Sequence, residues 1–131
     1  MLNRRHLLGV IVLSTALSLG SIASAEDRLP FDQAAFEAAQ AAGKPILVEV
    51  SAPWCPICKA QAPTLARLKS EPRFKELVSF NIDFDTQKDL LRAFNVQKQS
   101  TLIVFKGKQE TGRSTGVTDP GAIETLLGKS I

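Results

Sequence analysis

The sequence has 131 residues, among them 16 Lys and Arg, 13 Asp and Glu, two Cys and one His. A chain of this length can bury one hydrophobic core and is too short for two domains of ordinary size. Its small excess of positive charge does not indicate nucleic-acid binding, which requires basic residues clustered on one face.

The N-terminal segment has the three parts of a secretory signal peptide. It opens with the basic pair Arg4-Arg5, continues with an apolar stretch over residues 7–19, and ends in small residues with an A-x-A exit. This order predicts that residues 1–25 are a signal peptide and that residues 26–131 form the mature protein. The apolar stretch is short for a membrane span of about 20 residues, although an uncleaved anchor is the alternative. The arginine pair also permits twin-arginine export.

Cleavage of this leader would change the composition that matters for function. The mature protein would keep 14 basic and 13 acidic residues and would lose its single histidine, His6. A protein without histidine cannot use an imidazole as a general base or as a metal ligand. The leader is bacterial in character, so we expect export to the periplasm.

The first half of the mature chain predicts a helix, a strand and a second helix. Alanine-rich, apolar positions at helical spacing predict a helix over residues 31–42, which Gly43 ends. The short β-branched run over residues 46–50 is typical of a buried strand. A second helix is expected over residues 56–69, with a kink at Pro63.

The second half of the chain predicts three strands and two helices. Strands are expected near residues 77–82, 101–105 and 109–114, the last two paired antiparallel across a tight turn. Helices are expected over about residues 87–94 and after Asp119, whose side chain can cap the last helix. Strands that alternate with helices and close in a hairpin predict an α/β domain, with a central mixed sheet of four to five strands flanked by helices.

Cys55 and Cys58 are the only cysteines, and they stand where the first predicted strand gives way to the second helix. Unpaired N–H groups and the dipole at a helix N-terminus favour a negatively charged sulfur on Cys55. Cys58 lies one turn further on, close enough to attack a mixed disulfide formed at Cys55. This arrangement predicts thiol–disulfide exchange at the pair.

Three other uses of the cysteine pair compete with redox chemistry. A structural disulfide would close only a tiny loop, and loop closure is what makes a disulfide stabilising. A zinc site requires about four Cys or His ligands, and the mature chain offers two. Inert core cysteines fit poorly with a Trp-Cys-Pro segment that we expect to be exposed at a helix tip.

The sequence around the pair resembles the thioredoxin superfamily. Residues 44–59, which contain the motif Trp-Cys-Pro-Ile-Cys, are similar to the active-site strand and helix of that superfamily. Residues 80–83, residues 101–107 and the turn at Gly116 resemble the rest of its fold. The resemblance covers essentially the whole mature chain without a large insertion, which argues against the disulfide-forming oxidases that carry an extra helical domain.

The resemblance implies roles for residues around the pair, with Cys55 as the attacking thiol and Cys58 as the resolving thiol. Glu49 occupies the position of the buried acid that handles the Cys58 proton in thioredoxins, and a carboxyl group in an apolar strand suits that task. The alternative is that Glu49 points to solvent or into a salt bridge. Trp54, Pro56 and Ile57 belong to the expected substrate-binding surface. Trp54 would shield the disulfide and shape the docking surface. Pro56 and Ile57, which lie between the sulfurs, would tune the reduction potential, because such residues alter how well the thiolate is stabilised.

One departure from the superfamily concerns the loop that faces the cysteine pair. Thioredoxins place a cis-proline immediately before the facing strand, and this chain has Ser100 there, followed by Thr101. A cis bond before a residue other than proline costs about 3 kcal/mol, so we expect a trans Ser100 in a reshaped loop. We assign Ser100 and Thr101 to substrate binding, in a mode that differs from the usual one.

The favoured function is a periplasmic protein-disulfide oxidoreductase that reduces disulfides more than it forms them. The minimal size and the position of Glu49 favour reduction, and the Pro-Ile dipeptide lacks the His of the strongest oxidases. Its partners would be proteins with disulfides and a membrane-bound thiol electron donor. We expect a monomer without a cofactor, a metal or a nucleic-acid partner.

Two other classes of function stay open from the sequence. In the first, a metal or iron–sulfur binding module would use Cys55 and Cys58 from two chains across a dimer, since soft thiolates suit copper(I), zinc and iron–sulfur clusters. The missing proline leaves room for this alternative. In the second, the domain would be a non-catalytic interaction module.

Overall fold

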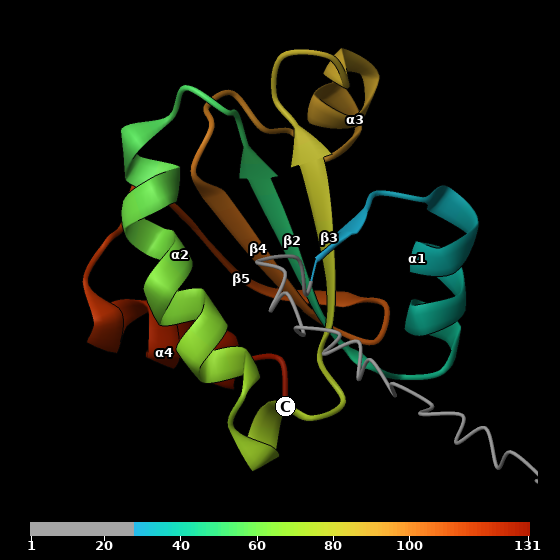
Figure 1. Cartoon of the computed structure of the whole chain (residues 1–131). Helices are drawn as coiled ribbons and strands as arrows, with labels where there is room; N and C mark the ends of the chain where they lie inside the picture. The colour runs from blue at the N-terminus through green and yellow to red at the C-terminus, as the bar shows by residue number, and fades with distance from the viewer. Residues whose placement is uncertain (1–27) are drawn as a thin grey trace, which may run out of the picture.

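The computed structural model describes residues 28–131 (Figure 1). The predicted signal peptide and its cleavage site lie outside the described residues, so the boundary after residue 25 stays a prediction. Within residues 28–131, no helix is long and apolar enough to cross a membrane.

A mixed sheet of five strands forms the centre of the fold, in the order β1-β3-β2-β4-β5. The strands are β1 (Leu29–Pro30), β2 (Pro45–Ser51), β3 (Val78–Asp83), β4 (Thr101–Lys106) and β5 (Gln109–Thr115). β2 lies in the middle, parallel to β3 and antiparallel to β4. β4 and β5 form the expected antiparallel hairpin. The predicted mixed sheet is therefore confirmed, and β1 is an additional edge strand that the element order predicted from the sequence did not include.

Helices cover both faces of this sheet (Figure 1). The helices are α1 (Gln33–Ala41), α2 (Pro56–Lys69), α3 (Lys88–Ala93) and α4 (Pro120–Gly128), with a short 3-10 turn η1 (Pro72–Phe74). α1 and α3 contribute to one hydrophobic cluster, and α2 and α4 to the cluster on the opposite face. α2 has the predicted bounds, and it continues past Pro63 without a break.

The central strand β2 divides its side chains between these two clusters. Ile46, Val48 and Val50 pack in the cluster of α1 and α3, whereas Leu47 packs in the cluster of α2 and α4. Burial of each such side chain stabilises the fold by about 1.5–3 kcal/mol. Because side chains alternate along a strand, Glu49 lies on the same face as Leu47, toward α2. The strand therefore places one acidic group under the helix that carries the cysteines.

Phenylalanine rings fill the core between α1 and the sheet. The ring of Phe36 lies edge-on to three others, with centroid distances of 5.9 Å to Phe80, 5.5 Å to Phe94 and 5.4 Å to Phe105. Edge-to-face pairs at such distances add about 0.5–1.5 kcal/mol each beyond the buried area. This cluster anchors α1, whose first turn is capped by the Asp32 carboxylate, which accepts from the Ala35 N–H over 2.7 Å.

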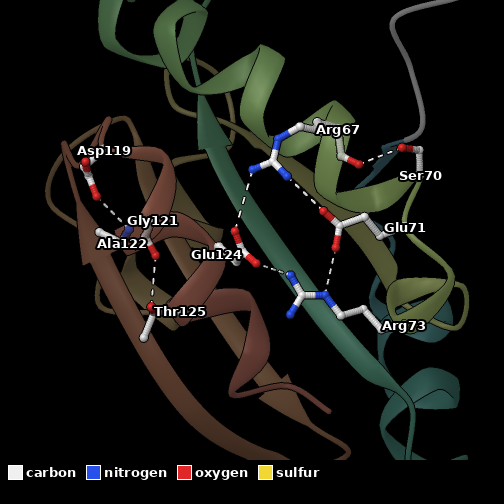
Figure 2. A network of polar contacts seen from close by, with 9 residues as sticks. All are labelled: Arg67, Ser70, Glu71, Arg73, Asp119, Gly121, Ala122, Glu124 and Thr125. Atoms are coloured by element: carbon white, nitrogen blue, oxygen red, sulfur yellow. Dashed lines mark hydrogen bonds and ion pairs between the residues drawn. The ribbon is translucent and has the colours of Figure 1, made fainter.

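A network of surface ion pairs joins the far end of α2 to η1 and α4 (Figure 2). Glu71 accepts from Arg67 and from Arg73, over 2.9 and 2.8 Å. Glu124 on α4 accepts a hydrogen bond from the Arg73 guanidinium over 2.5 Å, and its other carboxylate oxygen lies 3.8 Å from an Arg67 nitrogen. The network links the C-terminal end of α2 to η1 and α4, whereas the cysteines lie at the other end of the helix.

Candidate active site

The cysteine pair lies where β2 ends and α2 begins. The loop after Ser51 brings Cys55 to the N-cap position of α2, one residue before Pro56. Cys55 and Cys58 form a disulfide, and the backbone N–H of Cys58 donates to the Cys55 sulfur over 3.1 Å. A thiolate on Cys55 would accept the same N–H and would face the positive end of the helix dipole. The position therefore suits thiolate chemistry, as the sequence predicted.

Exposure around the pair differs in one respect from what we expected. Trp54 is 54% exposed and Ile57 is 38% exposed, so the segment does form a surface tip. Cys55 itself is 0% exposed, whereas Cys58 is partly exposed. The expectation of an exposed Cys55 is wrong for this disulfide form, because the sulfur faces inward, toward the loop before β4. A partner must displace part of this cover before it reaches the Cys55 sulfur.

Trp54 is held by the loop that follows β3. Its indole N–H donates to the Asp85 carboxylate, with distances of 2.9 and 3.2 Å to the two oxygens. Its ring stands edge-on to Phe84 with a centroid distance of 6.4 Å. These contacts fix the largest exposed apolar side chain beside the disulfide. Sequence reasoning missed Phe84 and Asp85, since nothing local marks them as partners of Trp54.

Ser100 lies against the buried side of Cys55. The Ser100 hydroxyl oxygen is 3.6 Å from the Cys55 sulfur, and Ser100 is 3% exposed. No peptide bond within residues 28–131 is cis, and Ser100 has a positive φ of 59°. The loop is thus built differently from a cis-proline loop. The Thr101 hydroxyl donates to the Lys98 carbonyl and contacts the Thr115 hydroxyl, so this buried side chain is engaged between β4 and β5.

Glu49 is buried under α2 and is paired with a lysine of that helix. It is 4% exposed, and its Oε2 accepts from Lys69 Nζ and from the Ser79 hydroxyl, both over 2.7 Å. Arg28 lies 3.5 Å from Oε1. A buried carboxylate is tolerated only where such partners offset its desolvation. The expectation that Glu49 could point to solvent is therefore wrong. Glu49 does form a salt bridge, and it does so while buried.

A hollow of about 390 Å³ opens beside Cys58. Its lining includes Arg28, Lys59, Asn81 and Asp83 as well as Cys58. Asn81 is the register partner of Glu49 in the neighbouring strand, and Arg28 reaches both the hollow and the Glu49 carboxylate. A hollow of this size has room for water beside Cys58.

Gln61 is a buried polar residue of α2 that the sequence interpretation overlooked. Its side-chain amide donates to the Ser100 carbonyl over 3.2 Å and to the Val117 carbonyl over 2.9 Å. It therefore ties the loop before β4 and the loop before α4 to the helix of the cysteines. The signal that could have found it is its spacing, because Gln61 falls on the same stripe of α2 as the buried Leu65 and Leu68.

The family model named Thioredoxin matches residues 28–129. The chain belongs to the thioredoxin family. It is 35% identical over 92 residues to the bifunctional thioredoxin reductase/thioredoxin of Mycobacterium leprae, covering 70% of this chain and 20% of that protein. It is 30% identical over 120 residues to a protein disulfide-isomerase of Aspergillus niger, covering 92% of this chain and 23% of that protein. The chain thus spans about a fifth to a quarter of these two relatives.

Solved structures give the same assignment. The crystal structure of Trxlp from Edwardsiella tarda superposes with a TM-score of 0.73 at 47% sequence identity, covering 75% of this chain and 95% of that chain. With the family, the fold and the disulfide together, this thioredoxin-family protein is a thiol–disulfide oxidoreductase with Cys55 and Cys58 as its pair. Thioredoxin-type proteins act on disulfides of protein substrates.

Proposed function

We propose that this thioredoxin-family protein is exported to the periplasm and there reduces disulfides in protein substrates. The observation that carries the chemistry is the disulfide at the N-terminus of α2, where the Cys58 N–H already contacts the Cys55 sulfur over 3.1 Å. Two features support the reducing direction. Glu49 lies buried under the helix, and the residues between the sulfurs, Pro56 and Ile57, bring no positive charge that would stabilise a thiolate and with it the reduced form. Strong oxidants, in contrast, owe their potential to a stabilised reduced form.

The proposed reaction has two exchange steps. The Cys55 thiolate attacks one sulfur of a substrate disulfide, the other substrate sulfur leaves as a thiolate that takes up a proton, and a mixed disulfide joins Cys55 to the substrate. Cys58 then gives up its proton and attacks the Cys55 sulfur, so that the second substrate sulfur leaves. Two electrons pass to the substrate, and the Cys55–Cys58 disulfide remains.

Glu49 is proposed to accept the Cys58 proton in the second step. Its carboxylate is fixed by Lys69 and Ser79, and the hollow beside Cys58 is lined by Asn81, the register partner of Glu49. A water molecule in this hollow could carry the proton between Cys58 and the carboxylate. This proton route concerns the resolving cysteine only, and it does not involve the groups that contact Cys55.

The oxidised protein must be reduced again before it acts on another substrate. The periplasm lacks a soluble reducing thiol pool, so a reductase there depends on electrons that cross the membrane. We therefore propose a membrane-bound thiol donor, and we propose that the domain meets donor and substrate as a monomer. The exposed Trp54 and Ile57 would form the surface that both of them approach.

The reduction potential of the Cys55–Cys58 couple tests the direction. The full chain is expressed, the protein is purified, and it is equilibrated against dithiol buffers of known potential. A value near −270 mV, at the thioredoxin end of the scale, is expected for a reductase. A value near −120 mV would refute the reducing direction and indicate a disulfide donor. N-terminal sequencing of protein from the periplasmic fraction tests export, with a mature start after residue 25 as the expected result.

A further inference from the structure

Ser100 is the one side chain outside α2 whose polar atom lies beside the Cys55 sulfur in the described structure. The hydroxyl oxygen is 3.6 Å from that sulfur, and both residues are buried. In the disulfide neither sulfur carries a hydrogen, so the hydroxyl is the donor of this contact. Because the contact is shielded from water, it acts more strongly than a similar contact at the surface.

The backbone of Ser100 is held in an unusual conformation by three hydrogen bonds. Its φ of 59° lies in the left-handed region, which costs a non-glycine residue of order 1 kcal/mol. Its N–H donates to the Val50 carbonyl over 2.8 Å, and its carbonyl accepts from the Gly116 N–H over 3.0 Å and from Gln61 over 3.2 Å. A proline could neither donate that N–H nor adopt that φ. The loop is therefore built around a residue with an N–H at this position.

Gln61 completes this arrangement from the helix that carries the cysteines. Its amide donates to the carbonyls of Ser100 and Val117. Because Gln61 is buried, water cannot take the place of these two hydrogen-bond partners. An apolar residue would fill the same volume but would leave the Ser100 carbonyl with one partner fewer. The side chain thus couples the position of the Ser100 loop to the first turns of α2.

We propose that the Ser100 hydroxyl donates a hydrogen bond to the Cys55 thiolate in the reduced protein, and that Gln61 is the positioning residue that holds Ser100 for this task. The hydroxyl keeps its proton throughout, and no bond to it forms or breaks. A donor to the thiolate stabilises the reduced form more than the disulfide, so it raises the reduction potential. The Cys55 thiolate then has two hydrogen-bond donors, the Ser100 hydroxyl and the Cys58 N–H.

The inference rests on thiol–disulfide exchange at Cys55 but not on its net direction. A charge-assisted hydrogen bond of ordinary strength changes the equilibrium constant for reduction about tenfold, which is about 30 mV for this two-electron couple. The two ends of the potential scale named above differ by about 150 mV. The hydroxyl therefore adjusts the potential without deciding between a reductase and an oxidase.

Ser100→Ala and Ser100→Gly form a matched pair for the test. Both remove the hydroxyl, and glycine does so without strain at a positive φ, so it folds even if alanine does not. Equilibration of each full-length protein against glutathione should show reduction about tenfold less favourable than in the unchanged protein. Thr125→Ala, which removes a hydroxyl on the exposed face of α4, should leave the equilibrium constant unchanged. The thiolate absorbance of reduced Cys55 at neutral pH should fall in both Ser100 variants.

Gln61 is tested through a double variant. Gln61→Met should shift the equilibrium constant in the same direction by a smaller factor, and Ser100→Gly combined with Gln61→Met should match Ser100→Gly alone, because the two residues act in series. Folded Ser100→Gly protein with an unchanged equilibrium constant and an unchanged thiolate absorbance would overturn the proposal. Additive effects of the two substitutions would overturn the role of Gln61. Neither result depends on whether the unchanged protein proves to be a reductase.

Discussion

The pair of Glu49 and Lys69 gives the sharpest prediction about stability. Lys69→Met removes the contact of 2.7 Å between Nζ and Oε2, and it leaves the buried carboxylate with Ser79 and the longer contact to Arg28. Breaking a fully buried ion pair costs about 3–5 kcal/mol. Lys69 keeps 12% of its side-chain exposure and Glu49 keeps two partners, so we expect a loss of about 2 kcal/mol.

Urea unfolding of the oxidised protein measures this loss. A loss of about 2 kcal/mol corresponds to a melting temperature lower by about 8–15 °C in a domain of this size. Lys59→Met, which removes an exposed lysine from the same helix, should change the free energy of unfolding by less than about 0.5 kcal/mol. The double variant Glu49→Gln with Lys69→Met should lose less than the sum of the single losses. If Lys69→Met resembles Lys59→Met, the carboxylate does not depend on the lysine and the reasoning from burial is refuted.

Three further predictions concern the cysteines, the core and the acid range. Cys58→Ser should accumulate a mixed disulfide between Cys55 and substrate, visible as a band on non-reducing gels that a reductant removes, whereas a chain without Cys55 should form no such band. Phe36→Ala should lower the free energy of unfolding by about 3–5 kcal/mol in urea titrations, because its ring packs against the rings of four other phenylalanines. The hydrogen bond from Lys44 lowers the pKa of Glu76, so it stabilises the fold above the unfolded pKa of that carboxyl, and this contribution is lost as the pH falls through the lower folded value. Lys44→Met should therefore lower the melting temperature at neutral pH and have a smaller effect once Glu76 is protonated.

The helices and central strands could be predicted because their signals are local. Residues 56–69 were predicted as a helix and α2 has these bounds, since Pro56 fits the first turn and Leu65 and Leu68 mark the buried stripe. β1 was missed, because a strand of two residues has no periodicity and exists only through its pairing with β3. The same reason limits any prediction of short edge strands.

The parts of the site that are marked by a local sequence pattern could be predicted. The contacts between residues far apart in the sequence could not. The position of Cys55 and Cys58 after a buried strand indicated the redox pair without any tertiary information. The salt bridge of Glu49 joins residues 20 positions apart, so no local pattern marks Lys69 as its partner. The exposure of Cys55 was predicted wrongly for the same reason, since the loop that covers it comes from a distant part of the chain.

The two cysteines have different surroundings, and residues of α2 take part in both of them. On the Cys55 side, Gln61 reaches the carbonyl of Ser100, whose hydroxyl contacts the sulfur. On the Cys58 side, a hollow lined by Arg28 opens beside the sulfur, and both Arg28 and Lys69 of α2 lie against the Glu49 carboxylate. A change in the seating of α2 would therefore alter the stabilisation of the attacking thiolate and the proton route of the resolving thiol together. The ion pairs at the far end of α2 are exposed and each adds little stability, so the buried contacts of Gln61 and Lys69 are the ones that link the position of α2 to the cysteines (Figure 2).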